Sequence, residues 1–372
     1  MSQYTILHTI ETGGPGGAET VVLELASHLD PERFRSLVVL PGGRWLPKKL
    51  RERGLPTITA SSKAWYDLSL VRTLTRVVRQ ERVDLIHSHL PDQNFYSCLA
   101  SRVARCKVVV TYHGSPAISA NAGAKRAIKS WVVRHSADAV VVVSDYLRDL
   151  LAGAGFPSER IVRIYNGVNL SQFSSCGAGA LRAELGCSPE TQLVGMVANF
   201  RQSKGYEHFV RAAHKVAERC GAVRFVAVGE MDERIGRRML DLRQELGLQE
   251  RFFFLGFRED IAAVLQDLDV FVLSSVSEGL SIATIEAMAA GKPVVVTRCG
   301  GPEEIVEDGR TGFLVRPADP DALAERICDV LSNPDRARSV GQNAQAEVKR
   351  RFSLETMVRE YERLYQRLLN TH

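Results

Sequence analysis

The sequence predicts an α/β protein built from two Rossmann-like domains, each with a doubly wound parallel sheet. Its 372 residues exceed the roughly 250 to 300 residues at which a single hydrophobic core stops growing. Short apolar, β-branched runs alternate with longer amphipathic runs, a pattern typical of βαβ units. Because the same alternation starts again near the middle of the chain, we expect two sheets rather than one.

The first half of the chain predicts seven strands with helices between them. Residues 18–29, for example, space Val21, Val22, Leu25 and Leu29 at helical intervals, which gives one apolar stripe facing a sheet. The expected strands are residues 5–9, 36–40, 57–59, 85–88, 108–112, 139–143 and 161–164.

The second half predicts six further strands and a final amphipathic helix. The small, Gly-rich segment Ser174–Ala180 fits a linker, and a plain surface loop is the alternative. We therefore place a first domain at 1–175, a second at 176–352, and a C-terminal helix within 353–372 that docks on its own domain or back on the first. The six strands are expected at 193–198, 224–228, 251–255, 270–273, 293–297 and 312–315.

Composition excludes several protein classes. Hydrophobic residues make up 45% and charged residues 24% of the chain, which disfavours disorder and coiled coil. No apolar run approaches the roughly 18 residues of a membrane-spanning helix, and the N-terminus lacks the features of a signal peptide, so a cytoplasmic protein is expected. Seven singly scattered cysteines argue against a disulfide framework and a zinc knuckle, and favour free thiols.

The net charge of +5 is unevenly distributed. Residues 1–170 hold 22 Lys and Arg against 14 Asp and Glu, whereas residues 171–372 hold 26 against 29. A basic first half attracts phosphate-bearing partners or an anionic membrane surface. Nothing in the sequence predicts a nucleic-acid partner.

The N-terminal glycine loop does not fit a nicotinamide-binding motif. Counted from Gly14, the third glycine of GxGxxG is replaced by Glu19. GxxxxGK[ST], HExxH and GxSxG motifs are absent too, which disfavours P-loop, zincin and α/β-hydrolase enzymes. Gly16 and Gly17 instead allow a ligand to approach the start of a helix closely, although a tight turn is the alternative.

Three histidines follow neighbouring predicted strands. His87, His89 and His113 are expected at the carboxyl edge of the first sheet, where open α/β folds bind ligands. A zinc site formed by the three is not favoured, because an HxH pair with a distant third histidine is a poor match to a zinc-binding pattern. For His87 and His89 a hydrogen-bonded structural role is the alternative.

The second half offers cations and carboxylates at predicted strand ends. Arg201 and Lys204 follow a strand, and two cations there neutralise a diphosphate without a metal ion. Glu278 precedes a helix that starts near Ser281, and Glu286 lies one turn inside it. The helix start between the carboxylates favours a diphosphate, while each carboxylate accepts hydrogen bonds from hydroxyl groups. Alternatively, glutamates near a helix start only stabilise its dipole.

Seven residues separate Glu278 from Glu286 in EGLSIATIE, which resembles the EX7E motif of the family-4 retaining glycosyltransferases with the GT-B fold. The resemblance extends along nearly the whole chain. Other segments follow in the family's order: GGAE from Gly16, HSH from His87, HG from His113, NGV from Asn166, NFRQSKG from Asn199, VGE from Val228, LGFRED from Leu255, and GGPEEIVEDGRTGFLV from Gly300.

The resemblance implies two Rossmann-like domains facing a cleft, the first on the acceptor side and the second binding a nucleotide sugar. It implies that Arg201 and Lys204 bind the donor's pyrophosphate, that Glu286 binds the ribose, and that Glu278 and His113 contact the transferred sugar. Thr20 departs from the family, since many relatives have Arg there. The remaining donor-binding residues expected on this basis are Gly16, Gly17, Gly229, Phe257, Arg258, Gly279, Leu280, Ser281 and Ile282.

We therefore predict a metal-independent, retaining transfer of a hexose-type sugar from a nucleoside diphosphate to an acceptor hydroxyl, in polysaccharide or glycolipid assembly. No cofactor is expected. The alternatives are a sugar-nucleotide epimerase or hydrolase, and a non-catalytic nucleotide-sugar-binding protein. The nucleobase, the sugar and the acceptor, whether a glycan or lipid-linked, are left open.

The sequence of one basic helix in the first half predicts that the protein contacts an anionic membrane peripherally, on the inner face of that membrane. Lys125 and Arg126, together with Lys129 and Arg134, surround Trp131 in this helix. Lys125 and Arg126 are also expected on the acceptor side, with His87 and His89. A sheet-covering helix with a solvated basic face is the alternative.

Overall fold

The computed structural model describes residues 3–43, 45–62, 64, 67–114, 123–174, 177 and 179–370. The chain forms two compact units. The first consists of residues 1–167 and 354–372, and the second of residues 168–353. The predicted linker at 174–180 and the segment 115–122 lie partly or wholly outside the described residues.

Within the described residues, the first unit contains a seven-stranded sheet in the order β3-β2-β1-β4-β5-β6-β7. Every pair of neighbouring strands is parallel. The order reverses between β1 and β4, which makes that point the switch point of a doubly wound sheet. The strands are β1 (Tyr4–Ile10), β2 (Phe34–Leu40), β3 (Thr57–Thr59), β4 (Leu85–His89), β5 (Lys107–Tyr112), β6 (Ala139–Val142) and β7 (Ile161–Arg163).

The second unit repeats this topology with a six-stranded sheet, again counted over the described part of the chain, in the order β10-β9-β8-β11-β12-β13. Its pairs are all parallel, and its switch point lies between β8 and β11. The strands are β8 (Gln192–Val197), β9 (Val223–Val228), β10 (Phe252–Gly256), β11 (Val270–Leu273), β12 (Val294–Thr297) and β13 (Phe313–Val315). The two doubly wound parallel sheets confirm the predicted fold class.

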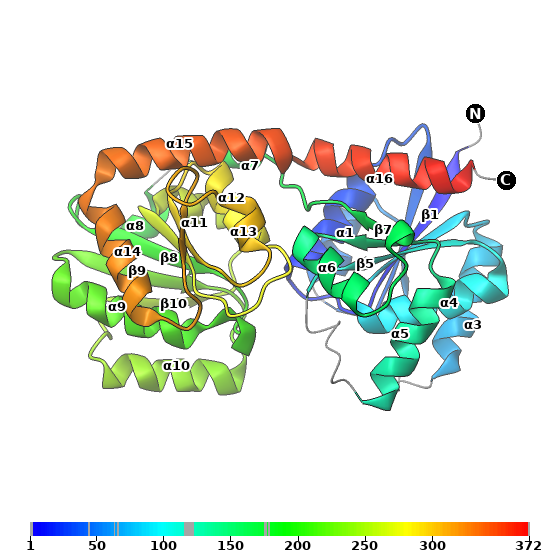
Figure 1. The fold of residues 1–372 in the computed structure, drawn as a ribbon, viewed down its shortest axis with the longest axis horizontal. Helices are drawn as coiled ribbons and strands as arrows, with labels where there is room; N and C mark the ends of the chain where they lie inside the picture. Colours follow the sequence, from blue (N-terminus) through cyan, green and yellow to red (C-terminus); the bar gives the residue numbers. More distant parts are fainter. Residues whose placement is uncertain are drawn as a thin grey trace. The chain divides into compact units, whose positions relative to one another are not determined.

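Helices connect the strands in both units (Figure 1). The first unit contains α1 (Gly17–His28), α2 (Trp45–Glu52), α3 (Leu68–Gln80), α4 (Pro91–Ala104), α5 (Ala124–Ser136), α6 (Asp145–Gly153) and α16 (Leu354–Leu369). The second contains α7 (Ser171–Ser174), α8 (Ala180–Glu184), α9 (Tyr206–Arg219), α10 (Glu233–Glu245), α11 (Ile261–Asp267), α12 (Ile282–Ala289), α13 (Pro302–Ile305), α14 (Pro320–Ser332) and α15 (Pro334–Arg351). None of these helices is both long and apolar enough to span a membrane.

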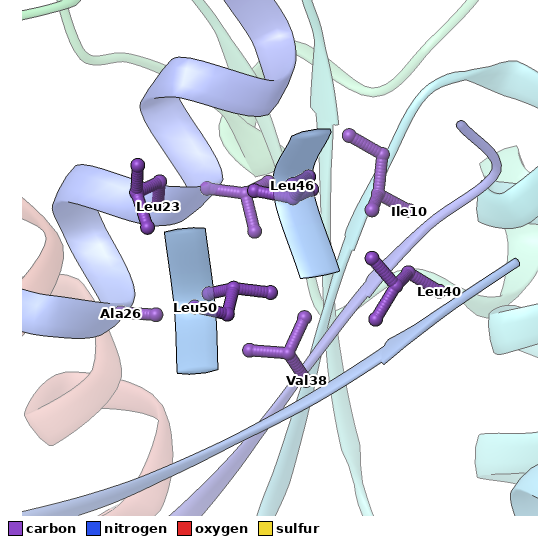
Figure 2. Packing of buried hydrophobic residues seen from close by; sticks show 8 residues of the cluster. Ile10, Leu23, Ala26, Val38, Leu40, Leu46 and Leu50 are labelled. Carbon is purple, nitrogen blue, oxygen red and sulfur yellow. The ribbon is translucent and has the colours of Figure 1, made fainter. Parts of the chain in front are cut away.

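A compact apolar cluster holds the end of β1 in place. Figure 2 shows Leu46 and Leu50 of α2 pointing toward Leu23 of α1 and Val38 of β2. The side chains of Leu46 and Leu50 are completely buried, and each burial contributes roughly 1.5 to 3 kcal/mol. The Leu46 amide also donates to the Gly13 carbonyl at 2.9 Å. The glycine loop after β1 is therefore anchored to the core of its unit.

Although α16 is the last helix of the chain, it packs on the first sheet. The Tyr365 hydroxyl bonds to His87 Nδ1 at 2.6 Å, and the Tyr365 ring lies edge-on to Phe34 with centroids 6.0 Å apart. Glu362 Oε1 accepts a hydrogen bond from the Asp30 amide at 2.8 Å. The apolar face of this helix therefore completes the core of the first unit.

Candidate active site

The site in the second unit forms at the switch point between β8 and β11. The loop after β8 turns at Gly205, whose φ of +62° is left-handed and whose missing Cβ would lie 2.2 Å from the Ser274 carbonyl oxygen. The Val276 amide donates to the Ser203 carbonyl at 2.8 Å, which joins this loop to the one after β11. The glycine is thus required for two loops to meet at one sheet edge.

Lys204 and Glu278 meet where these two loops join. Lys204 Nζ lies 2.6 Å from Glu278 Oε1, and the Ser275 hydroxyl donates to the same oxygen at 2.7 Å. The Glu278 side chain is 8% exposed and that of Lys204 is 23% exposed. Because the ammonium has three N–H donors, it can hold the carboxylate and still donate to a bound anion.

The start of α12 lies directly after this pair in the chain. Ser281 caps the helix by accepting a hydrogen bond from the Thr284 amide at 3.3 Å. Gly279 packs so closely on Gly301 that a Cβ on Gly301 would lie 2.2 Å from the Gly279 carbonyl oxygen. The structure thus places Glu278 before the helix start and Glu286, half-buried, in its second turn.

Arg201 is exposed where the chain leaves β8, and its guanidinium has no hydrogen bond or ion pair within the described residues. Arg258 differs, because its guanidinium lies between Asp260 Oδ2 at 2.7 Å and Glu184 Oε2 at 2.8 Å. These two hydrogen-bonded carboxylates raise the pKa of Arg258. The charge of Arg258 is therefore already compensated, which leaves its backbone and the neighbouring Phe257 ring, 43% exposed, to contact a ligand.

Gly229 is required by the packing of two strand ends. Its φ is +156°, and an added Cβ would lie 1.9 Å from the Ala198 carbonyl oxygen after β8. The Gly229 amide donates to the Gly256 carbonyl at 2.9 Å. The ends of β8, β9 and β10 are therefore held close together, next to the Lys204 loop.

The glycine loop of the first unit is partly filled by its own helix. Gly16 is the N-cap residue of α1, and a Cβ there would lie 2.4 Å from Glu19 Oε2. The Glu19 carboxylate also accepts a hydrogen bond from the Thr12 hydroxyl. A glycine at position 16 therefore has a role within the unit itself, because the absence of a side chain makes room for the Glu19 carboxylate at the positive end of α1. The Thr20 hydroxyl donates to the Gly16 carbonyl at 3.0 Å.

The histidines of the first unit form a buried row that the sequence did not fully predict. His8 of β1 lies opposite His87 of β4, and side chains two apart on a strand share a face, so His89 joins them. His87 Nε2 bonds to the Thr111 hydroxyl at 2.7 Å and its Nδ1 to Tyr365. Because both its ring nitrogens are used within the unit, the geometry favours the structural alternative for His87.

His113 follows β5 and is held by His89, whose Nδ1 lies 3.0 Å from His113 Nε2. The other nitrogen of His113, Nδ1, is buried without a partner in the described part of the chain. Burial lowers the pKa of His113 to about 4 and that of His8 to about 3, so both rings are neutral at pH 7.

Nitrogen atoms of His8, His87 and His89 lie within 4.8 Å of one another. This set differs from the one in the sequence-based zinc hypothesis, because His8 takes the place of His113. The nitrogens of His87 are already hydrogen-bonded, and a dication would be buried there without a carboxylate. The donor set therefore fits a metal ion poorly.

Comparison with known proteins identifies the family. The model of "Glycosyltransferase Family 4" matches residues 15–172, and that of "Glycosyl transferases group 1" matches residues 191–333. The alpha-maltose-1-phosphate synthase of Mycolicibacterium smegmatis is 32% identical over 310 residues, which span 77% of this chain and 79% of that protein. The chain belongs to the glycosyltransferases. The N-acetyl-alpha-D-glucosaminyl L-malate synthase of Bacillus anthracis is 27% identical, over 81% of this chain and 79% of that protein.

Solved structures agree with the GT-B fold of this glycosyltransferase. The crystal structure of Anabaena HepE in complex with UDP and glucose superposes with a TM-score of 0.87, at 25% identity over 98% of this chain and all of the other. A glycosyltransferase from Rickettsia africae has the same TM-score at 24% identity. The expected GT-B fold is thereby confirmed, and so is the expectation that the chain is a glycosyltransferase.

Proposed function

We propose that this glycosyltransferase moves a sugar from a nucleoside diphosphate to an acceptor hydroxyl with retention of the anomeric configuration. The observation that carries the proposal is the Lys204–Glu278 pair at the β8/β11 switch point, next to the start of α12. The bond between the anomeric carbon and the diphosphate oxygen breaks, and a bond to the acceptor oxygen forms on the same face. The departing phosphate oxygen takes the acceptor's proton.

The roles of the residues follow from where charge develops. The leaving diphosphate gains negative charge, which Lys204, Arg201 and the N–H groups at the start of α12 stabilise in place of a metal ion. Glu278 accepts hydrogen bonds from the sugar hydroxyls, and Glu286 from the ribose. His113 Nδ1, buried and without a partner among the described residues, contacts the sugar near the reacting carbon.

We propose a uridine diphosphate sugar as the donor. Support comes from Anabaena HepE, solved with UDP and glucose and also with UDP-glucose. The backbone at Phe257 and Arg258 then contacts the uracil. A thermal-shift panel of uridine, guanosine and adenosine diphosphate sugars tests this, because the ligand that binds the folded state raises its melting temperature. A larger shift with a guanosine or adenosine donor would replace the uridine assignment.

Lys204→Ala tests the transfer reaction itself. Removing this charge should lower the transfer rate by roughly a hundredfold or more, with far-ultraviolet circular dichroism unchanged. The matched control is Lys215→Ala in the same unit, which removes an ammonium that pairs with Asp321 at 2.8 Å. Near-normal transfer by Lys204→Ala would refute its role. Product formed without any acceptor would favour the epimerase or hydrolase alternative, and tight donor binding without turnover the non-catalytic one.

We propose that an anionic membrane binds the surface formed by α3, α4 and α5 of the first unit. Figure 1 shows these three helices side by side. Four large hydrophobic side chains are exposed among the described residues of this unit, and all four lie on these helices. They are Leu68 at 55%, Val103 at 56%, Ile128 at 48% and Trp131 at 57% exposed. The three helices hold eight Lys and Arg and one acidic residue, Asp92. Apolar side chains among cations are typical of membrane-surface helices.

The cations exposed on these three helices differ from the set that the sequence predicts. Lys129 was expected on the basic face of α5, but its side chain is 7% exposed and its Nζ lies 2.5 Å from Asp92 Oδ1. Lys125 and Arg126 are exposed on this helix. A groove of about 710 Å³ between α3 and α4 adds four arginines, Arg72, Arg76, Arg79 and Arg102, around an apolar floor of Val71 and Leu99.

Vesicle co-sedimentation tests the membrane contact. The protein should sediment with vesicles of phosphatidylcholine and phosphatidylglycerol, but not with phosphatidylcholine alone. Replacing Arg72, Arg76 and Arg102 with Gln should weaken binding roughly a hundredfold, since each cation contributes about 1 kcal/mol. The matched control replaces three exposed arginines of the second unit, Arg237, Arg338 and Arg350, with Gln. Equal binding by both triple variants would remove this proposal.

A further inference from the structure

Two cysteines that are 108 residues apart in the chain meet in the second unit. Cys220 is the C-cap residue of α9, and Cys328 lies in α14. The two helices pack directly against each other, and Figure 1 draws α9 next to α14. The Sγ atoms lie 3.1 Å apart, and both side chains are half-buried. Since a disulfide holds its sulfurs about 2.05 Å apart, an approach of about 1 Å joins them.

The other described cysteines lack such a neighbour. Cys98 and Cys299 are buried, whereas Cys106 and Cys187 are half-buried. No second sulfur lies within hydrogen-bonding distance of any of these four in the part of the chain that the structure describes. The pair is therefore a specific feature of the α9–α14 contact.

We propose that Cys220 and Cys328 are a modification site that forms a reversible intramolecular disulfide with a low-molecular-weight disulfide as the oxidant. The Cys220 thiolate attacks one sulfur of the oxidant and releases one small thiol. Cys328 then loses its proton, attacks Cys220 Sγ and releases the second thiol. The two protein thiols lose two electrons and two protons in total, and the small disulfide is reduced to two thiols.

The environment of the pair sets the order of these steps. Burial and the neighbouring Cys220 raise the pKa of Cys328 to about 12, and the Arg219 cation opposes this shift. We therefore assign the first attack to Cys220 and the second to Cys328. Because Cys328 is already in contact with Cys220, the second step is intramolecular.

The bond links the C-terminal end of α9 to α14 and so restricts the unfolded second unit. Closing a long chain segment lowers the entropy of the unfolded state, so oxidation should stabilise this unit. The Lys204 loop lies at the opposite end of α9, a helix of 14 residues and roughly 20 Å in length. Oxidation is therefore expected to leave donor binding unchanged, so this site is independent of the proposed transfer function.

The test uses the full chain with oxidised glutathione. Intact mass should fall by two hydrogen atoms, and a non-reduced digest should contain a peptide that joins Cys220 to Cys328. The melting temperature should rise by roughly 5 °C or more and return after dithiothreitol. Cys328→Ser should stop at the first step, with one glutathione attached to Cys220. Cys187→Ser is the matched control, because it changes a half-buried cysteine of the same unit and should still cross-link.

Two outcomes would overturn the proposal. One is that both thiols still react with iodoacetamide after oxidation. The other is that each carries its own glutathione without a cross-link. Because mass and melting temperature need neither donor nor acceptor, these readouts do not depend on whether the chain transfers a sugar.

Discussion

The two sheets share a strand order around their switch points but place different chemistry there. Between β1 and β4 the first unit has buried, neutral imidazoles, with His8 beside His87. Between β8 and β11 the second unit has a partly exposed ion pair, Lys204 with Glu278. One topology therefore supports a buried, neutral cluster in one unit and a partly exposed ion pair in the other. On the basis of this difference, our proposal assigns the diphosphate to the second unit and neutral hydrogen bonds to the first.

The largest expected effect concerns the pH dependence of the imidazole row. Burial lowers the pKa of His8 to about 3 and of His113 to about 4, and places those of His87 and His89 well below the usual 6.5. Below pH 6.5 the unfolded chain binds protons that the folded chain does not, so stability falls as the pH decreases toward these values. At pH 5, each buried ring lowers the free energy of unfolding by about 2 kcal/mol.

Urea unfolding at pH 7.5 and pH 5 measures this effect. Wild type should lose several kcal/mol between the two, whereas His8→Leu should lose about 2 kcal/mol less than wild type. The control His214→Leu removes a histidine that is 36% exposed in the second unit, and should keep the wild-type pH dependence. Identical pH dependence in His8→Leu and wild type would mean that His8 is not buried as described.

Gly229→Ala tests how tightly the second switch point is built. The added Cβ would lie 1.9 Å from the Ala198 carbonyl oxygen at a φ of +156°, so we expect a loss of roughly 3 kcal/mol or more. Gly247→Ala is the control, because its φ of +65° is also left-handed but nothing lies within 4 Å of its Cβ. It should cost only about 1 kcal/mol. Equal melting temperatures of the two variants would contradict the close packing at β8 and β9.

Glu278→Gln separates sugar contact from diphosphate contact and is expected to have the smallest effect. The neutral amide no longer holds the Lys204 ammonium, so UDP affinity should stay the same or increase. Transfer should still fall about tenfold if Glu278 accepts hydrogen bonds from the sugar. Titration calorimetry with UDP and steady-state transfer kinetics measure the two quantities. A loss of UDP binding would assign Glu278 to the diphosphate instead.

The sequence predicted the fold well because the signals are local. Each of the thirteen expected strands overlaps an observed one, and the predicted C-terminal helix matches α16 (Leu354–Leu369). The periodicity of hydrophobic residues and the glycines that end helices and strands are both local features of the sequence. A single sequence is therefore enough to locate these elements.

Contacts between distant residues were harder to predict. Lys204 was expected at a phosphate and Glu278 at a sugar, but their direct contact spans 74 residues and depends on which strands are neighbours. His8 was missed because nothing in YTILHTI distinguishes it from a core position until β1 pairs with β4. Lys129 was misplaced, since helical spacing does not show that Asp92 of α4 lies beneath it.

Isothermal titration of UDP and of uridine into wild type, Lys204→Ala and Lys215→Ala tests the central claim most directly. Wild type and Lys215→Ala should bind UDP far more tightly than uridine. Lys204→Ala should lose roughly tenfold to a hundredfold in UDP affinity while uridine binding stays the same. If Lys204→Ala binds UDP as wild type does, or loses UDP and uridine affinity equally, the switch point between β8 and β11 is not the diphosphate site.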